Sequence, residues 1–339
     1  MHVPDIVPTQ FEKNLSNSDP DSLRLLSNIN PLVSKKLFNG GFITLEAVAS
    51  ASIRELTACG NIQESMALKL INEAQKSLGI DFISADKVLE SRRNMMRLTT
   101  GVDALDDLLG GGIETGSVTE IYGEYGTGKT QVAHQLCVTS HLPCERGGIT
   151  NDVKKAITCI YIDTEGSFRP ERIVSMANEY SDDLNIKSIL KHILHGRAFN
   201  SDHQMILTER IIREAPLRNV KLVIIDSLIT HFRAEYVGRG TLASRQQKLN
   251  QHLHSLLRLA EIYNLAIILT NQVQAAPDTF FGDPTTPVGG HILAHSTHTR
   301  IYLRKSKGER RIARIVDSPM LPENEVVFAI TADGLKDVF

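Results

Sequence analysis

The residues best suited to chemistry form one glycine-rich stretch, Gly123-Glu124-Tyr125-Gly126-Thr127-Gly128-Lys129-Thr130. Its spacing matches G-x-x-x-x-G-K-[ST], in which backbone N–H groups gather around phosphate oxygens at a helix N-terminus. We expect Lys129 to reach the β- and γ-phosphates, as one of the catalytic residues, and the Thr130 hydroxyl to ligate Mg²⁺. An ordinary glycine-rich turn has a similar composition. The strand-like run 117–122 before it and the helical spacing of apolar residues after it favour a nucleoside triphosphate site.

Polar residues follow three other apolar runs. Asp226 ends the run 222–225 and is a second candidate ligand for Mg²⁺, although a strand-end aspartate can also cap a turn. Asp163 and Glu165 follow the run 157–162, and a carboxylate there can deprotonate the attacking water. Glu165 is the candidate base, with Asp163 as the alternative. Gln272 follows the run 265–269, where its amide can sense a γ-phosphate.

These residues need elements that bring them together. Short apolar runs alternate with amphipathic stretches after Leu98, which predicts an α/β fold with a mainly parallel sheet. The ligands of such sheets sit beyond the carboxyl ends of the strands. The runs 299–303, 312–316 and 326–330 lie close together and predict an antiparallel extension, with a basic turn at 305–311 that we interpret as a solvated hairpin.

The N-terminal quarter has a different pattern. Residues 1–20 have a loop-like composition and predict a flexible tail. Residues 21–76 predict a small helical domain of helix-hairpin-helix type, with an apolar face at Leu32, Val33, Leu37, Leu45, Val48, Ala49, Ala67, Leu68, Leu70 and Ile71. Such hairpins can grip a DNA backbone, but its first break reads Asn28-Ile29-Asn30-Pro31, without glycines, so plain packing is an equal alternative. Residues 77–97 form a linker to the core at 98–339.

Two stretches predict flexible loops that carry basic and aromatic residues. The first, 232–240, holds Arg233, Tyr236 and Arg239, with Arg245 just beyond it. The second, 274–289, contains three prolines and the pair Phe280-Phe281, and is too irregular for a core element. Cations for phosphates and aromatic rings for bases are what single-stranded nucleic acid requires. An ordinary charged surface loop is the alternative.

The composition limits the class of protein and its cellular compartment. The chain has 339 residues, of which 42% are hydrophobic and 22% charged, with a formal net charge of −2, as expected of a soluble globular protein. The four cysteines have no C-x-x-C spacing, which argues against a zinc site or a disulfide framework. No apolar run approaches the roughly 18 residues of a membrane span. We therefore expect a cytoplasmic protein without a membrane partner.

Several motifs in order resemble the RecA superfamily, and within it the strand-exchange recombinases of archaea and eukaryotes. They are Gly123 to Thr130 followed by Gln131, Asp163-Thr164-Glu165-Gly166-Ser167-Phe168-Arg169-Pro170-Glu171-Arg172, Tyr236-Val237-Gly238-Arg239-Gly240 and Thr270-Asn271-Gln272-Val273. Phe281-Gly282-Asp283-Pro284-Thr285 with Gly289-Gly290-His291 looks archaeal. The resemblance covers the chain from Leu23 onward. It implies a RecA-like P-loop ATPase core with a mainly parallel twisted sheet and an antiparallel C-terminal extension, preceded by a small all-α domain.

The resemblance also implies site residues, with ATP and Mg²⁺ as cofactors. Glu165 would be the base for hydrolysis, Arg172 would stack on the adenine and Gln272 would sense the γ-phosphate. The implied nucleotide contacts are Gly123, Glu124, Tyr125, Gly126, Thr127, Gly128, Lys129, Thr130, Gln131, Arg172, His291, Asp317 and Pro322. Of these, His291, Asp317 and Pro322 would come from a neighbouring subunit. The implied DNA contacts are Arg233, Tyr236, Gly238, Arg239, Arg245, Gln274, Phe280, Phe281, Gly289 and Gly290.

The stretch Phe82-Ile83-Ser84-Ala85 fits the F-x-x-A linker motif of that family, in which the aromatic and the small residue enter pockets of the next subunit. An apolar strand packed within its own domain is the alternative. Head-to-tail contacts build an open helical filament, or a ring where the rotation closes. The implied function is a DNA-dependent ATPase that pairs homologous strands at the nucleoid. Its partners would be single- and double-stranded DNA, further copies and recombination mediators.

Two rival functions share this nucleotide core. A non-exchanging paralogue would bind ATP and regulate recombinase filaments, and Glu165, both loops and the linker motif count against it. A ring-forming helicase or a small-molecule phosphotransferase would have no reason for the residues Phe82 to Ala85.

Overall fold

The computed structural model describes residues 23, 26, 29–93, 95–149, 156–275 and 285–338. For Arg239, Ala275, Thr285 and His291 it describes the backbone alone. The expected N-terminal tail, Phe280 and Phe281 lie outside the described residues, and the predictions made for them stay predictions.

The N-terminal part consists of short capped helices: α2 (Pro31–Asn39), α3 (Leu45–Ala49), α4 (Ile53–Ala58) and α5 (Glu64–Leu78). The glycine-poor break before α2 is a helix start, because the Asn30 side chain accepts a 2.8 Å hydrogen bond from Val33 N. Pro31 stands at the first helical position, where its missing N–H costs nothing. The apolar positions form one buried cluster, except that Leu32 and Leu68 are 63% and 47% exposed. Each lies one residue from a buried position, Val33 or Ala67, and a rotation of about 100° around the helix turns its side chain out of the buried face.

After α6 (Ala85–Arg93), the described chain builds the core. Its helices are α7 (Asp103–Leu108), α8 (Lys129–Thr139), α9 (Pro170–Asn178), α10 (Ile186–His192), α11 (Ser201–Arg218), α12 (Thr230–Glu235), α13 (Leu242–Tyr263) and α14 (Gly290–Ser296), with 3-10 turns η2 (Cys144–Arg146) and η3 (Arg239–Thr241). Its strands are β1 (Arg97–Leu98), β2 (Ile113–Glu114), β3 (Ser117–Gly123), β4 (Thr158–Asp163), β5 (Ile193–Arg197), β6 (Val220–Asp226), β7 (Ala266–Asn271), β8 (Val273–Ala275), β9 (Thr285–Pro287), β10 (Thr299–Lys305), β11 (Arg310–Asp317), β12 (Glu325–Thr331) and β13 (Gly334–Asp337).

Within the described residues the central sheet has nine strands in the order β13-β12-β11-β10-β3-β7-β6-β4-β5. From β10 to β5 every neighbouring pair is parallel, and β11, β12 and β13 extend the sheet antiparallel. This confirms the predicted fold class. Because β3, β7, β6 and β4 are neighbours, their carboxyl ends bring the phosphate loop, Gln272, Asp226 and Glu165 to one edge.

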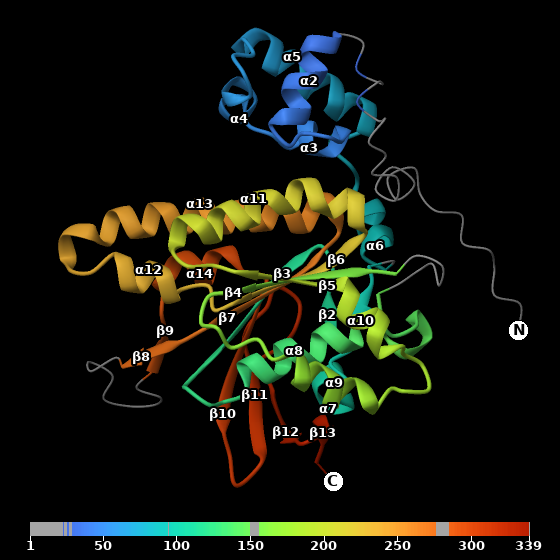
Figure 1. The fold of residues 1–339 in the computed structure, drawn as a ribbon, viewed down its shortest axis with the longest axis vertical. Coiled ribbons are helices and arrows are strands. Elements are labelled where there is room, and N and C mark those ends of the chain that lie inside the picture. The colour runs from blue at the N-terminus through green and yellow to red at the C-terminus, as the bar shows by residue number, and fades with distance from the viewer. Residues whose placement is uncertain are drawn as a thin grey trace, which may run out of the picture.

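Helices cover both faces of the sheet (Figure 1). One face packs on α7, α8, α9 and α10, and the other on α11, α13 and α14. Alternate residues of a strand enter opposite cores, as Tyr161 and Ile162 of β4 do. Burial on both faces explains why these strands read as continuous apolar runs.

Some elements were not predicted. The edge strand β5 contains His195, Gly196 and Arg197 and lacks an apolar run. The linker contains α6, which has no buried residue. The ends of the irregular stretch 274–289 pair as the short strands β8 and β9, at the base of the second loop.

The N-terminal helices stand over α11 and α13 (Figure 1). Arg258 of α13 makes a two-pronged ion pair with Glu55 of α4, at 2.7 Å and 2.6 Å, and its Nη1 also donates to Ser50 O. Burial would raise the pKa of Glu55, but the hydrogen bonds and charge of Arg258 together with Ser52 lower it to about 2. Arg213 of α11 lies over the Phe38 ring at 5.9 Å.

Candidate functional site

The phosphate loop leaves β3 at Gly123 and enters α8 at Lys129. Gly123 is required by space, and Gly128 by its backbone conformation. A Cβ at Gly123 would lie 2.2 Å from Leu303 O, and one at Gly128 would lie 2.2 Å from Ile330 Cδ1. Gly128 also has φ of 103°, a left-handed conformation that side chains disfavour. The loop therefore has the backbone shape of an anion-binding turn at a helix start.

Lys129 and Thr130 begin α8 and point back toward the strand ends. Lys129 Nζ donates to Gly123 O and Glu124 O, both at 2.8 Å. Burial lowers the pKa of Lys129, although the nearby Asp226, Glu165 and Glu124 carboxylates oppose this. Thr130 Oγ1 donates to Asp226 Oδ2 at 2.8 Å. The two residues predicted from sequence to hold Mg²⁺ thus lie in direct contact.

Asp226 lies at the centre of a hydrogen-bonded cluster. Besides Thr130, its carboxylate accepts from Tyr161 Oη at 2.7 Å, Thr270 Oγ1 at 2.5 Å and Ser167 Oγ at 3.2 Å. Burial, reinforced by the Asp226 charge, raises the pKa of Tyr161 well above its usual value, which keeps the phenol a donor. Among the described residues, no group of three or more His, Cys, Asp or Glu could hold a metal alone. A carboxylate beside a hydroxyl still fits Mg²⁺, which is usually held by one or two carboxylates, waters and substrate phosphates.

Glu165 and Gln272 come from different strand ends and meet. Gln272 Nε2 donates to Glu165 Oε1 at 2.9 Å, and Thr230 Oγ1 donates to the same oxygen at 2.7 Å. The Glu165 side chain is exposed, on the same sheet edge as the phosphate loop. Glu165 and Gln272 were each singled out from the sequence, whereas Thr230 was not.

Asp163 has a different environment from Glu165. It is buried, and its carboxylate accepts main-chain hydrogen bonds from Glu165, Gly166, Ser167 and Phe168 at 2.7–3.3 Å. Burial would raise the pKa of Asp163, but these donors and the 3.3 Å contact with His195 Nε2 lower it. Asp163 therefore anchors the segment that carries Glu165.

His134 was missed by sequence reasoning. Its Nδ1 donates to Thr130 O at 2.6 Å, and its Nε2 accepts from Arg169 N at 3.1 Å. The ring also stacks on Phe168. Burial lowers the pKa of His134, which favours the neutral ring that these two contacts require. Its position one helical turn after Thr130 was the signal available in the sequence.

Arg172, the predicted adenine contact, begins α9. Its Nε donates to Gln131 Oε1 at 2.7 Å and its Nη2 to Thr331 O at 2.7 Å, while Nη1 donates to Ala332 O. The turn between β12 and β13 therefore holds the guanidinium beside α8. Sequence reasoning predicted Gln131 and Arg172 separately, and the structure brings them together.

The two stretches predicted to bind DNA flank α13, which packs against both η3 and α14. The first of them was expected to be a loop, but residues 232–235 belong to α12 and the 3-10 turn η3 begins at Arg239. Arg233 and Gly238 are exposed, Arg245 is half-buried on α13, and Lys248 lies 5.5 Å from the Tyr236 ring. In the second loop Gln274 is exposed in β8, and Gly289 and Gly290 have φ of 104° and 59° at the start of α14. The side chains of Arg239 and His291, with Phe280 and Phe281, lie outside the description.

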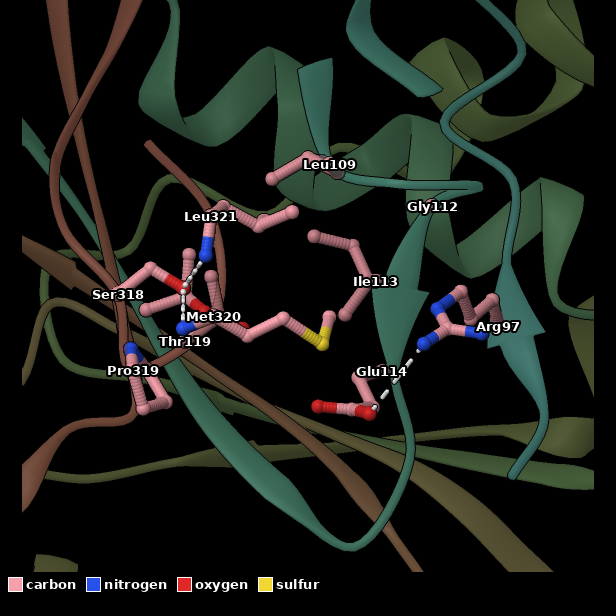
Figure 2. Close-up of a pocket in the computed structure, with 11 residues that line it drawn as sticks. Arg97, Leu109, Gly112, Ile113, Glu114, Thr119, Ser318, Pro319, Met320 and Leu321 are labelled. Carbon is pink, nitrogen blue, oxygen red and sulfur yellow. Dashed lines mark hydrogen bonds and ion pairs between the residues drawn. The ribbon is translucent and has the colours of Figure 1, made fainter. Parts of the chain in front are cut away.

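Asp317 and Pro322, by contrast, do not join this edge. In the sheet, Leu303 of β10 pairs with Gly123, whereas Arg300 pairs with Asp317. Because β11 runs antiparallel, it carries Asp317 and the segment after it toward the amino ends of the parallel strands. Figure 2 shows this segment over a pocket, where Met320 and Leu321 face Ile113. Both Asp317 and Pro322 are exposed.

The linker is also open to solvent. The Phe82 side chain is fully exposed, and Ala85 begins α6. From α6, Arg92 donates to Glu114 Oε1 at 2.9 Å, beside the pocket of Figure 2. Cys59, Cys137, Cys144 and Cys159, which all lie among the described residues, form no disulfide. None of the helices in the described part of the chain could serve as a membrane span.

Comparison with known proteins agrees with this geometry. Residues 91–338 match the model of the Rad51 family. The chain is also 49% identical, over 318 residues, to the DNA repair and recombination protein RadA of Ignicoccus hospitalis. That alignment covers 94% of this chain and 96% of the relative. The chain therefore belongs to the Rad51 family.

Proposed function

We propose that the protein is an ATP-hydrolysing recombinase of DNA repair, which assembles on single-stranded DNA and pairs it with a homologous duplex. Membership of the Rad51 family supports this function. The observation that carries it is that the phosphate loop, Glu165 and Gln272 share one edge of the sheet while Asp317 and Pro322 lie away from it. Such a chain has half of a nucleotide site at one edge of the sheet. Its Asp317 and Pro322 are placed to complete the nucleotide site of a second copy.

ATP would bind with its phosphates at the N-terminus of α8 and its adenine beside Arg172. The Gln131 and Thr331 contacts hold that guanidinium in place. Mg²⁺, held by Thr130 and Asp226, would neutralise charge on the β- and γ-phosphates. Lys129 now donates to two loop carbonyls, and we propose that it exchanges them for phosphate oxygens.

Glu165 would act as the base for hydrolysis. Within the described residues, its hydrogen-bond donors Gln272 and Thr230 both contact Oε1, so Oε2 can accept a proton from water. The buried Asp163 carboxylate is saturated by main-chain donors and is a poor candidate. We therefore assign Glu165 the proton transfer and Asp163 the positioning of its loop.

A second copy would complete the site. Its Asp317, Pro322 and His291 would cover the ATP, and its Phe82 and Ala85 would enter pockets of the adjoining copy. Full exposure of Phe82 and the position of Asp317 support this arrangement. A head-to-tail contact gives an open filament, or a ring where it closes.

DNA would be held by the two loops beside α13. Arg233, Arg239 and Arg245 would contact phosphates, and Tyr236, Phe280 and Phe281 would contact bases. Gln274 would contact the DNA strand through its side chain, and Gly238, Gly289 and Gly290 would let the backbone approach it. The base pairing of the DNA would supply sequence specificity. Such a protein acts at the nucleoid of the cytoplasm, and recombination mediators are its candidate further partners.

The test measures ATP hydrolysis with and without single-stranded DNA, together with the formation of joint molecules from homologous strands. We expect hydrolysis to rise with single-stranded DNA and joint molecules to need ATP. A Lys129→Ala variant supplies the background for both measurements. Hydrolysis that ignores single-stranded DNA, without joint molecules, would refute the proposal and favour a regulatory paralogue or another phosphotransferase.

A further inference from the structure

A buried polar network extends from the interior of the sheet to the base of the second loop. Arg300 Nε donates to Glu120 Oε2 at 2.7 Å. Glu120 Oε1 accepts from Asn271 Nδ2 at 2.7 Å, and the same nitrogen donates to Val288 O at 2.7 Å. The four residues come from β10, β3, β7 and the end of the second loop.

The side chains of this polar network are deeply buried. Glu120 and Asn271 are 0% exposed, and Arg300 is 8% exposed. Arg300 also lies 5.4 Å from the centre of the Tyr122 ring, and its Nη2 is buried without a hydrogen-bond partner among the residues that the structure describes. A buried ion pair contributes little net stability compared with apolar residues of similar volume, because desolvation opposes the attraction. Stability alone is therefore a weak reason to place these charges in the interior.

The orientation of Asn271 follows from its neighbours. Its nitrogen faces two acceptors, the Glu120 carboxylate and Val288 O, and its Oδ1 accepts from Gln272 N at 2.8 Å. Val288 N in turn donates to Gln272 O at 2.9 Å. Both main-chain groups of Gln272 are thus bonded, one to the Asn271 side chain and the other to Val288.

Gln272 and the second loop consequently share one hydrogen-bonded unit. On one side, Gln272 reaches the Glu165 carboxylate through its Nε2. On the other, Val288 directly precedes Gly289 and Gly290, whose left-handed conformations begin α14. A displacement of Gln272 would pull on Val288, while Asn271 stays bonded to Glu120, which Arg300 holds in place.

We propose that Asn271 is a positioning residue that couples Gln272 to the second loop, with Glu120 and Arg300 as its fixed anchor. This deepens the proposed function, on which it rests: Asn271 contacts neither ATP nor DNA, yet it makes DNA affinity depend on the nucleotide. The bond from Asn271 to Val288 O carries the coupling. The bond to Glu120 only keeps the amide in place.

These two bonds can be separated by substitution. Asn271→Asp removes both donated bonds and sets a second carboxylate beside Glu120. Adding Glu120→Gln restores the contact between the two positions, because the new amide can donate to the aspartate and accept from Arg300. Val288 O remains without its donor in this double variant. Gln75→Ala is a matched control, since Gln75 also donates an amide N–H to a backbone carbonyl, Ala49 O, among the N-terminal helices.

The experiment measures the thermal midpoint and the dissociation constant for a labelled single-stranded oligonucleotide, with ADP and with a non-hydrolysable ATP analogue. For the wild type we expect the two nucleotides to change the dissociation constant by about 5- to 150-fold. The double variant should regain the thermal midpoint lost by Asn271→Asp, while its dissociation constants with the two nucleotides become nearly equal. Gln75→Ala should keep the wild-type ratio.

Recovery of both the midpoint and the nucleotide dependence in the double variant would overturn the inference, because Asn271 would then act through stability alone. An unchanged ratio in Asn271→Asp would overturn it as well. A wild-type protein whose DNA affinity ignores the nucleotide would instead refute the proposed function. Should Asn271→Asp fail to fold, Asn271→Ala with the same two measurements decides between coupling and stability.

Discussion

Two regions of the core differ in how completely they are formed within one chain. At the phosphate-loop edge, Asp226, Asp163 and Asn271 are buried and satisfied by hydrogen bonds. Phe82 of the linker is exposed, and so are Asp317 and Pro322 at the two ends of the segment 317–322. If the proposed function holds, the catalytic half of the site is preorganised by folding, whereas the covering half would come from a second copy. Substitutions in the two regions should therefore fail in different ways.

The largest effect is expected for Glu165→Gln. Loss of the base should slow ATP hydrolysis about 10²- to 10⁴-fold, measured by phosphate release with single-stranded DNA present. Glutamine can still accept from Gln272 and Thr230, so ATP-dependent assembly, followed by light scattering, should persist. Loss of assembly with unchanged hydrolysis would reverse the assignment of this region to chemistry.

In the other region, Phe82→Glu should weaken the association between copies. Removing an anchor of this kind typically costs an interface about 2 kcal/mol or more, which weakens association roughly 30-fold. Sedimentation velocity should show a shift toward monomers, while the thermal midpoint of the monomer is unchanged because the side chain is exposed. Val88→Glu, at another exposed apolar position of the linker, is the control. Equal effects of both substitutions would argue against a specific contact at Phe82.

Asp163→Ala should distinguish anchoring from catalysis. The substitution leaves the main-chain N–H groups of residues 165–168 without their shared acceptor and should lower the free energy of unfolding by about 1–3 kcal/mol. Glu165→Ala, at an exposed position two residues away, should change it by less than about 0.5 kcal/mol. Chemical denaturation of both variants gives the two values. Equal stabilities would mean that Asp163 is not the anchor of this loop.

The smallest effect concerns the contact between the N-terminal helices and α13. The folded-state pKa of Glu55 is lowered from 4.5 to about 2, so its stabilisation is complete above pH 4.5 and is lost as pH falls toward 2. Glu55→Gln should reduce the pH dependence of the thermal midpoint between pH 4.5 and 2. Above pH 6 the pH dependence should be nearly the same in the variant and the wild type. Because Glu55 is partly exposed, salt should shrink the difference. A variant with the full wild-type dependence would contradict this contact.

Much of the fold could be predicted from sequence because β3, β4, β6 and β7 are buried on both faces and read as apolar runs. The edge strand β5 could not, because a strand with one open edge tolerates His195 and Arg197. Leu32 and Leu68 were expected in the core, yet they face solvent. Helical periodicity alone cannot say how wide the buried face of a small helical unit is.

The candidate site divides in the same way. Glu165, Gln272, Asp226 and Thr130 could be placed together because each follows a strand or the phosphate loop of one parallel sheet. The anchoring by Asp163 depends on a loop that folds back over the carboxylate, and no residue spacing reports that. The position of His134 and the buried polar network through Asn271 likewise depend on contacts between distant segments.

The direction of β11 has a consequence for any assembly built in this way. Because this antiparallel strand takes Asp317 away from the phosphate loop of its own chain, every copy in the proposed assembly would have one face that covers a nucleotide and another that binds one. At one end of an open row of such copies, a nucleotide site would remain uncovered. At the other end, a covering segment would have no nucleotide site to contact. The two ends of the row are chemically unlike, so ATP there should turn over differently, and growth and loss of copies should occur at different rates at each.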